Sequence, residues 1–153
     1  MKVLTEPTAL EADALGANAF ALPQGLVGFP DYTRAELMYQ HDQLPFLWMK
    51  LQGPLGSINF VVIEPGGVIQ DYEPELFDND AAGLDLTDPS EAMVLTIVTL
   101  QRRVPVQATV NLVGPVIVNR RTRIGRQLII ANYSRYSARH PLVEVARAEA
   151  ATA

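Results

Sequence analysis

The sequence contains no cysteine. Disulfide bonds and thiolate zinc sites are therefore excluded, and nothing favours an oxidising compartment. No stretch approaches the roughly 20 apolar residues that a membrane-spanning helix needs. The first seven residues carry an acid and a proline where a signal peptide would need an apolar run. We therefore expect a cytoplasmic protein without a membrane partner.

Residues that commonly perform catalysis are also scarce, since the only histidines are His41 and His140. A nucleophilic triad needs Ser or Cys, a histidine base and an orienting acid. Ser137 precedes His140 by three residues, but Pro141 follows at once, which argues against a helix that would join them. Two isolated histidines do not indicate a metal site, and no Walker-type lysine loop is present. The sequence predicts no catalytic residue, no metal and no cofactor.

Positive charge is rare in the first two thirds of the chain. Residues 1–100 carry three basic and 15 acidic side chains, whereas residues 101–153 carry nine arginines and two glutamates. This asymmetry indicates either two partner surfaces or two halves that neutralise each other in the fold. Both interpretations stay open.

Short apolar and β-branched runs between proline and glycine turns dominate the chain, which is typical of an all-β domain. Trp48 is expected at least partly in the core, and the unbroken run 58–64 is typical of a central strand buried on both faces. Leu26 and Phe29 are expected to plug one end of the core. The clearest strands are predicted at residues 34–40, 46–51, 58–64, 93–100 and 106–112.

The predicted fold is a small, closed or partly open β-barrel with short helical segments at most. We expect one domain over residues 1–145, with an edge strand within residues 1–18 and a helical turn at 81–86. Residues 146–153 are expected to be a frayed helix or a disordered tail.

An arginine-rich hairpin is predicted near the end of the chain, with strands at 113–118 and 128–131 around a loop at 119–125. Pro115, Asn119 and Gly125 should set its geometry, because Asn tolerates and Gly freely adopts the left-handed region that reverses a chain. Four arginines lie within seven residues in and directly after this loop, namely Arg120, Arg121, Arg123 and Arg126. Such a cluster can bind phosphates, but the net charge is −5 and no aromatic residue lies among them. Pairing with acids of the first half is favoured over direct nucleic-acid binding.

Five motifs resemble, in order, the FliW family of flagellar assembly factors. The longest, Asn-Leu-Val-Gly-Pro-Val-Ile-Val-Asn-Arg-Arg-Thr-Arg-Ile-Gly-Arg-Gln at residues 111–127, is similar to the family signature, and Tyr-Ser-Ala-Arg-His-Pro-Leu follows at 136–142. The others are residues 22–29, Pro45-Phe46, and 59–65 followed by Asp71-Tyr72. Leu22 stands where the family usually has Phe.

The resemblance implies a β-barrel and a non-enzymatic role. FliW proteins bind the RNA-binding regulator CsrA, relieve its repression of flagellin translation, and also bind flagellin, which competes with CsrA. Residue chemistry alone predicts a β-domain that acts through its surface. The alternative is a small-ligand-binding or enzymatic β-barrel whose site is assembled from residues far apart in sequence.

The acidic stretch after residue 68 is the first candidate surface for CsrA. CsrA binds RNA, so its RNA surface must be positive, and a dense acidic segment would attract it. A solubilising acidic loop is the competing interpretation, and Arg120 and Arg121 are the second candidate region. The predicted partner-binding residues of the acidic stretch are Asp71, Tyr72, Glu73, Glu75 and Asp78.

Overall fold

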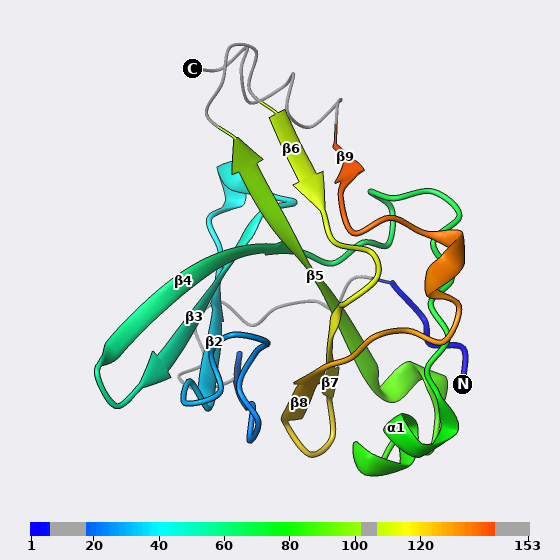
Figure 1. Ribbon diagram of the computed structural model, residues 1–153. Coiled ribbons are helices and arrows are strands. Elements are labelled where there is room, and N and C mark those ends of the chain that lie inside the picture. The colour runs from blue at the N-terminus through cyan, green and yellow to red at the C-terminus, as the bar shows by residue number, and fades with distance from the viewer. Residues whose placement is uncertain (7–17, 102–106, 143–153) are drawn as a thin grey trace.

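The computed structural model describes residues 1–6, 18–101 and 107–142 (Figure 1). The predicted tail at 146–153 and most of the predicted first strand lie outside the described residues. The strands are β1 Ala19–Ala21, β2 Arg34–Met38, β3 Leu47–Gly53, β4 Gly56–Ile63, β5 Ala92–Gln101, β6 Gln107–Val110, β7 Val116–Asn119, β8 Ile124–Gln127 and β9 His140–Pro141. The helices are α1 Asp78–Gly83 and the 3-10 turns η1 His41–Gln43, η2 Pro89–Glu91 and η3 Tyr133–Arg135.

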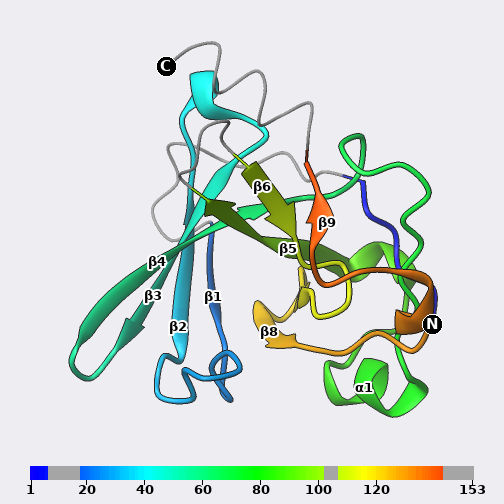
Figure 2. The same ribbon diagram turned by 45° about the horizontal axis from the view of Figure 1, so that its top comes forward.

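Seven of these strands close into a barrel, which confirms the predicted fold class. The order is β4-β3-β2-β1-β8-β7-β5, and β5 returns to β4. Neighbouring strands are antiparallel except β1 and β8, which meet in parallel at Ala21 and Ile124. β6 and β9 lie side by side beyond β5 (Figures 1 and 2).

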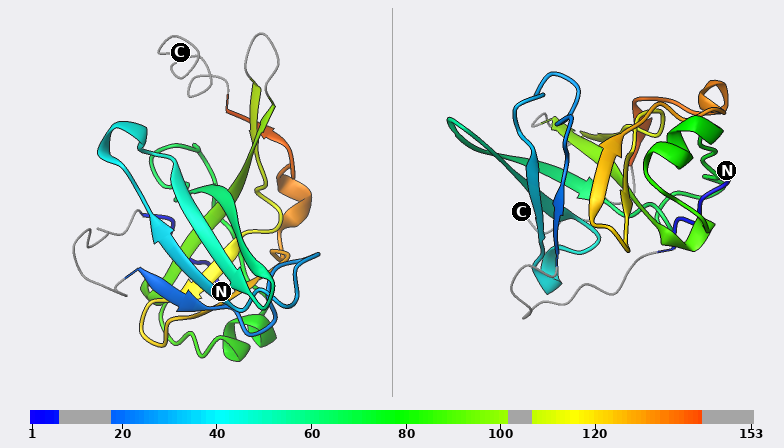
Figure 3. Two further views of the ribbon diagram at one scale, coloured as in Figure 1. Left: turned by 90° about the vertical axis from the view of Figure 1, so that its left-hand side faces the viewer. Right: turned by 90° about the horizontal axis from the view of Figure 1, so that it is seen from below.

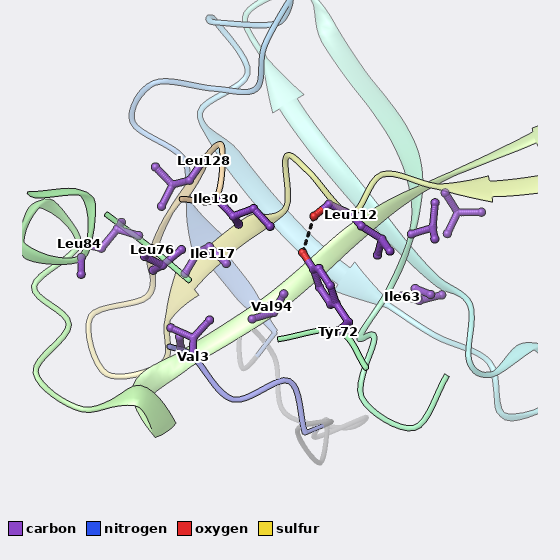
Figure 4. Close-up of a cluster of buried hydrophobic side chains, with 14 of the residues drawn as sticks. Val3, Ile63, Tyr72, Leu76, Leu84, Val94, Leu112, Ile117, Leu128 and Ile130 are labelled. Atoms are coloured by element: carbon purple, nitrogen blue, oxygen red, sulfur yellow. Dashed lines mark hydrogen bonds between the residues drawn. The ribbon is translucent and has the colours of Figure 1, made fainter. Parts of the chain in front are cut away.

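Two hydrophobic cores lie on opposite faces of β5. Leu95 points into the barrel with Met49, Leu51 and Val116, whereas its neighbour Val94 belongs to a second core outside the barrel. The β4–β5 connection, which contains α1, and the chain after β8 cover this outer core (Figures 1 and 4). Because both faces are covered, β5 is buried over most of its length.

Two burial predictions were wrong. In β4, Gly56 and Ser57 are exposed and burial is complete only at Val62 and Ile63, so the strand buried on both faces is β5. Trp48 is 40% exposed, because the alternating residues of β3 point into the barrel and Trp48 points outward. Its indole N–H donates to Gln43 at 3.3 Å.

The arginine-rich hairpin is tighter than predicted. Its second strand is β8, not 128–131, so Gly125 lies within a strand opposite Val118. The left-handed residue is Arg123, with φ 59°, and the prediction of a left-handed Gly125 was wrong. Asn119 also lies in a strand.

Other sequence predictions are confirmed. β2 and β3 form the predicted hairpin, and β6 alternates, with Ala108 and Val110 buried. The helical turn is present as α1, a few residues earlier than predicted. Leu26 is buried, and Phe29 packs edge-to-face on Phe60, so this turn closes one end of the barrel core.

Within the described ranges, none of the helices has the length and apolar character that a membrane span requires.

Candidate functional site

The acidic segment, residues 71–78, runs over the outer core in the β4–β5 connection. Tyr72, Pro74 and Leu76 point inward and are buried, whereas Asp71, Glu73 and Asp78 are exposed. Glu75 is half-buried, with Lys2 4.0 Å from its carboxylate. The alternation of buried and exposed residues therefore directs the carboxylates to solvent.

Tyr72 anchors this segment and does not belong to its exposed surface. Its hydroxyl donates to the carbonyl oxygen of Leu112 at 2.7 Å inside the outer core (Figure 4). Burial, and secondarily the nearby Tyr136, raises the pKa of Tyr72 well above its usual range. Of the five predicted contact residues in the acidic segment, Tyr72 is the one that the fold buries.

Two side chains from the region around η3 hold the backbone of the acidic segment in place. Asn132 accepts from the Glu75 N–H at 2.9 Å and donates to the Glu73 carbonyl at 2.8 Å. The hydroxyl of Tyr136 accepts from the Glu73 N–H at 2.9 Å and donates to the Asp71 carbonyl at 3.2 Å. These bonds pair the Asp71 carbonyl and both backbone groups of Glu73, so these two exposed carboxylates project from a braced chain.

Sequence reasoning did not assign this bracing role to Asn132 or Tyr136. Tyr136 opens the second motif of the resemblance, and Asp71-Tyr72 is another of its motifs. The presence of both motifs in one sequence was the signal that could have indicated a contact between them. The rings of Tyr72 and Tyr136 meet edge-to-face with centroids 4.9 Å apart, so the two motifs contact each other directly.

The arginine-rich loop is paired with acids of the first half of the chain. Arg121 contacts Asp85 at 3.0 Å and Glu91 at 2.8 Å, and Arg126 lies 3.8 Å from Asp80. Hydrogen bonds from Thr87, and then from Arg121, lower the pKa of Glu91 to about 2. This geometry supports the interpretation that the oppositely charged halves of the chain neutralise each other in the fold.

Arg120 is only half-buried but is also engaged with the protein. Its backbone N–H donates to the Glu91 carbonyl at 2.8 Å, and its guanidinium donates to the Glu6 carbonyl at 3.4 Å. Arg120 and Arg121 thus lie together at the loop, with the Arg121 side chain about half exposed. The loop offers less unpaired charge than its sequence suggests.

A surface depression of about 440 Å³ separates the acidic segment from β9. Ser137 and His140 both line it, but the Ser137 hydroxyl accepts from the Arg139 N–H at 3.0 Å, and no hydrogen bond joins it to His140 in this described region. No three metal-ligating side chains gather within residues 1–6, 18–101 and 107–142. The full lining is Ile69, Gln70, Asp71, Leu112, Arg135, Tyr136, Ser137 and His140.

The chain is thus a small β-barrel protein whose acidic segment presents exposed carboxylates over a second core. Comparison with known proteins gives the family. The family model described as "FliW protein" matches residues 5–142, and the chain belongs to the FliW family of flagellar assembly factors.

Individual relatives agree with this assignment. The flagellar assembly factor FliW of Natranaerobius thermophilus is 34% identical over 139 residues, which is 91% of each chain. That of Leptospira interrogans is 31% identical over 129 residues, covering 84% of this chain and 85% of the relative. A crystal structure of the flagellar assembly factor FliW superposes with a TM-score of 0.69 at 28% identity, covering 82% of this chain and 86% of that chain.

Proposed function

We propose that this flagellar assembly factor acts in the cytoplasm by binding proteins, without catalysing a reaction. Its partners are the translational regulator CsrA, which it antagonises, and flagellin, which competes for it. Flagellin synthesis is thereby matched to flagellin export. The family assignment supports the flagellar role, and the resemblance supplies the two partners.

The observation that carries the proposal is the braced acidic segment. Asp71, Glu73 and Asp78 are exposed, while Asn132 and Tyr136 fix the backbone from Asp71 to Glu75. A surface that is already ordered loses little conformational entropy on binding. An RNA-binding partner must carry a positive surface, so long-range attraction to these acids speeds association and disfavours acidic competitors.

Glu75 and the arginine loop have secondary roles in this proposal. Glu75 is half-buried beside Lys2, so it contributes less to the negative electrostatic potential of this surface than the exposed acids do. Arg120 and Arg121 form a second contact region, in which Arg121 is oriented by Asp85 and Glu91. Tyr72 contributes through packing beneath the surface.

The proposal is tested with three purified proteins. CsrA is mixed with this protein and analysed by size-exclusion chromatography with light scattering, and flagellin is then added. We expect a CsrA complex that flagellin disrupts, and release of CsrA-bound RNA when the complex forms. Failure to form a complex with CsrA at concentrations of about 10 µM, well above typical regulatory affinities, would contradict the proposal.

A further inference from the structure

The barrel has one stretch of strand with a free edge. β3 pairs with β4 from Gly56 to Val62, but β5 pairs with β4 only at Val61, Val62 and Ile63. In the part of the chain that the structure describes, no other strand reaches residues 56–60 of β4. These residues therefore have a strand neighbour on one side alone.

The ladder pattern shows which backbone groups face this edge. Gly53 and Gly56 close a two-residue hairpin turn, and the closing pair of such a turn is hydrogen-bonded. Bonded and non-bonded pairs alternate along an antiparallel ladder, so the N–H and C=O groups of Ser57 and Asn59 point away from β3. Both residues are exposed, and their backbone groups are available to another strand.

β5 also has an unpaired stretch of edge, and it lies on the side that faces β4. The Asn111 N–H donates to the Ile97 carbonyl at 2.9 Å, which turns the backbone groups of Ile97 toward β6. Backbone groups alternate in direction from residue to residue along a strand, so the N–H and C=O groups of Leu100 point toward β4. β4 and β5 pair only as far as Val61 and Val98 and diverge beyond that pair (Figure 1), so no strand of the described residues pairs with Leu100 on its β4 side. We call the region where the two strands diverge the wedge.

The side chains at the wedge are apolar on one face and polar on the other. Phe60 and Ile97 pack against the barrel core but stay only half-buried, and Ile58 is half-buried on the same face of β4. Ser57 and Asn59 lie on the opposite face. An added strand with alternating apolar and polar residues would cover the first face and leave its polar side chains in solvent.

The other end of the sheet is protected, whereas this edge is not. The outermost strand there, β9, ends in Pro141, which has no N–H to offer. Residues 56–60 of β4 read Gly-Ser-Ile-Asn-Phe, without the proline or charge that commonly blocks edge pairing. Leu55 at the hairpin tip is 96% exposed.

We propose that β4 residues 56–60 are a docking edge that takes up an extended segment of a partner protein as an added strand. Main-chain hydrogen bonds to Ser57 and Asn59 hold the segment, and alternating apolar side chains cover Ile58 and Phe60. The hairpin and α1 lie on opposite sides of the molecule, so the site is separate from the acidic segment (Figures 1 and 3). The inference therefore does not depend on CsrA or flagellin.

The test uses the full chain and a defined probe, the acetylated and amidated pentapeptide Thr-Val-Thr-Val-Thr. Amide hydrogen exchange is followed by NMR with and without millimolar peptide. We expect the Ser57 and Asn59 amides to exchange about tenfold more slowly with the peptide. The same peptide carrying N-methyl groups at alternate amides should have no effect, because it cannot complete the ladder.

Two variants separate the backbone contribution from that of the side chain. Asn59→Pro removes a donor that faces the free edge, while the β3–β4 bonds remain. It should abolish peptide binding, whereas Asn59→Ala should retain it. Absence of protection in the unmodified chain overturns the proposal whether or not Asn59→Pro folds. Equal protection by the N-methylated peptide, undiminished binding by a folded Asn59→Pro variant, or protection that rises with protein concentration without peptide would overturn it as well.

Discussion

The side-chain amide of Asn119 in β7 donates a 2.8 Å hydrogen bond to the carbonyl oxygen of Leu84, 35 residues away at the end of α1. It also donates to Asp85 at 3.2 Å, while its oxygen accepts from the N–H groups of Arg121 and Thr122. Asn119 is fully buried. One side chain thus joins the arginine-rich loop to the β4–β5 connection.

Replacing Asn119 should therefore be costly. Asn119→Ala leaves the buried Leu84 carbonyl and the part-buried N–H groups of Arg121 and Thr122 without this partner. We expect a loss of about 2–4 kcal/mol of unfolding free energy, measured by urea denaturation. Asn119→Asp keeps the acceptor for Arg121 and Thr122 but places an oxygen against two carbonyls, so it should also destabilise. A stability within about 0.5 kcal/mol of the unmodified protein for Asn119→Ala would contradict this role.

Gly125 should be intolerant of side chains because of close packing, not because of its backbone angle. A Cβ there would lie 2.9 Å from Val118 Cγ2 and 3.1 Å from the Ile117 carbonyl oxygen. We expect Gly125→Val to cost about 1–3 kcal/mol in denaturant unfolding. Gly83→Ala is the control, since a Cβ at Gly83 meets no atom within 4 Å, and its stability should be unchanged or higher. Equal effects of the two substitutions would argue against the packing explanation.

The Glu91 carboxylate should contribute pH-dependent stability. Its pKa in the folded state is about 2, below its ordinary value of 4.5. The contribution is therefore fully present above about pH 4.5 and is lost as the pH falls toward 2. We expect Glu91→Gln to lower the Tm at pH 7, with a difference that shrinks below pH 4.5. Exposed Glu36→Gln is the control, and a Glu91→Gln difference that stays constant with pH would contradict this assignment.

Tyr136→Phe should loosen the acidic segment without unfolding the barrel. The substitution removes the hydroxyl that bonds Glu73 N–H and the Asp71 carbonyl, while the ring can still pack on Tyr72. We expect a stability loss of about 1 kcal/mol, faster exchange of the Glu73 amide and slower association with CsrA. Tyr133→Phe, at a side chain 53% exposed, is the control. Unchanged exchange at Glu73 would show that the hydroxyl does not brace this segment.

The sequence predicted strands well where alternation or turn residues were clear. The β2–β3 hairpin followed from apolar runs around a proline-containing turn, and β6 followed from its alternation. β8 was misplaced because glycine was interpreted as a loop residue, although Gly125 lies in the strand where Val118 and Leu22 leave no room for a side chain. Close approach between distant residues leaves no periodic signal in a sequence.

The candidate site was only partly predictable, because it too depends on contacts between residues far apart in the sequence. The dense acidic stretch was visible in the sequence. The buried hydrogen bond of Tyr72, however, is made to Leu112, 40 residues away, and Asn132, which braces Glu75, is 57 residues away from it. The pairing of Arg121 with Asp85 and Glu91 likewise joins distant segments. Tertiary contacts therefore decide which acids are exposed and which arginines are occupied.

Our proposal that the braced acidic segment meets CsrA rests on the exposed carboxylates of Asp71, Glu73 and Asp78. It is tested most directly by the association rate constant with CsrA at low and moderate salt, for two variants of equal charge change. The test variant is Asp71→Asn, Glu73→Gln and Asp78→Asn, and the control is Asp31→Asn, Glu36→Gln and Asp42→Asn, all exposed residues. We predict that the test variant associates about tenfold more slowly at low salt, with a flatter salt dependence, while the control stays close to the unmodified protein. Equal association rates for the two variants at both salt concentrations would contradict the claim and direct the search to Arg120 and Arg121.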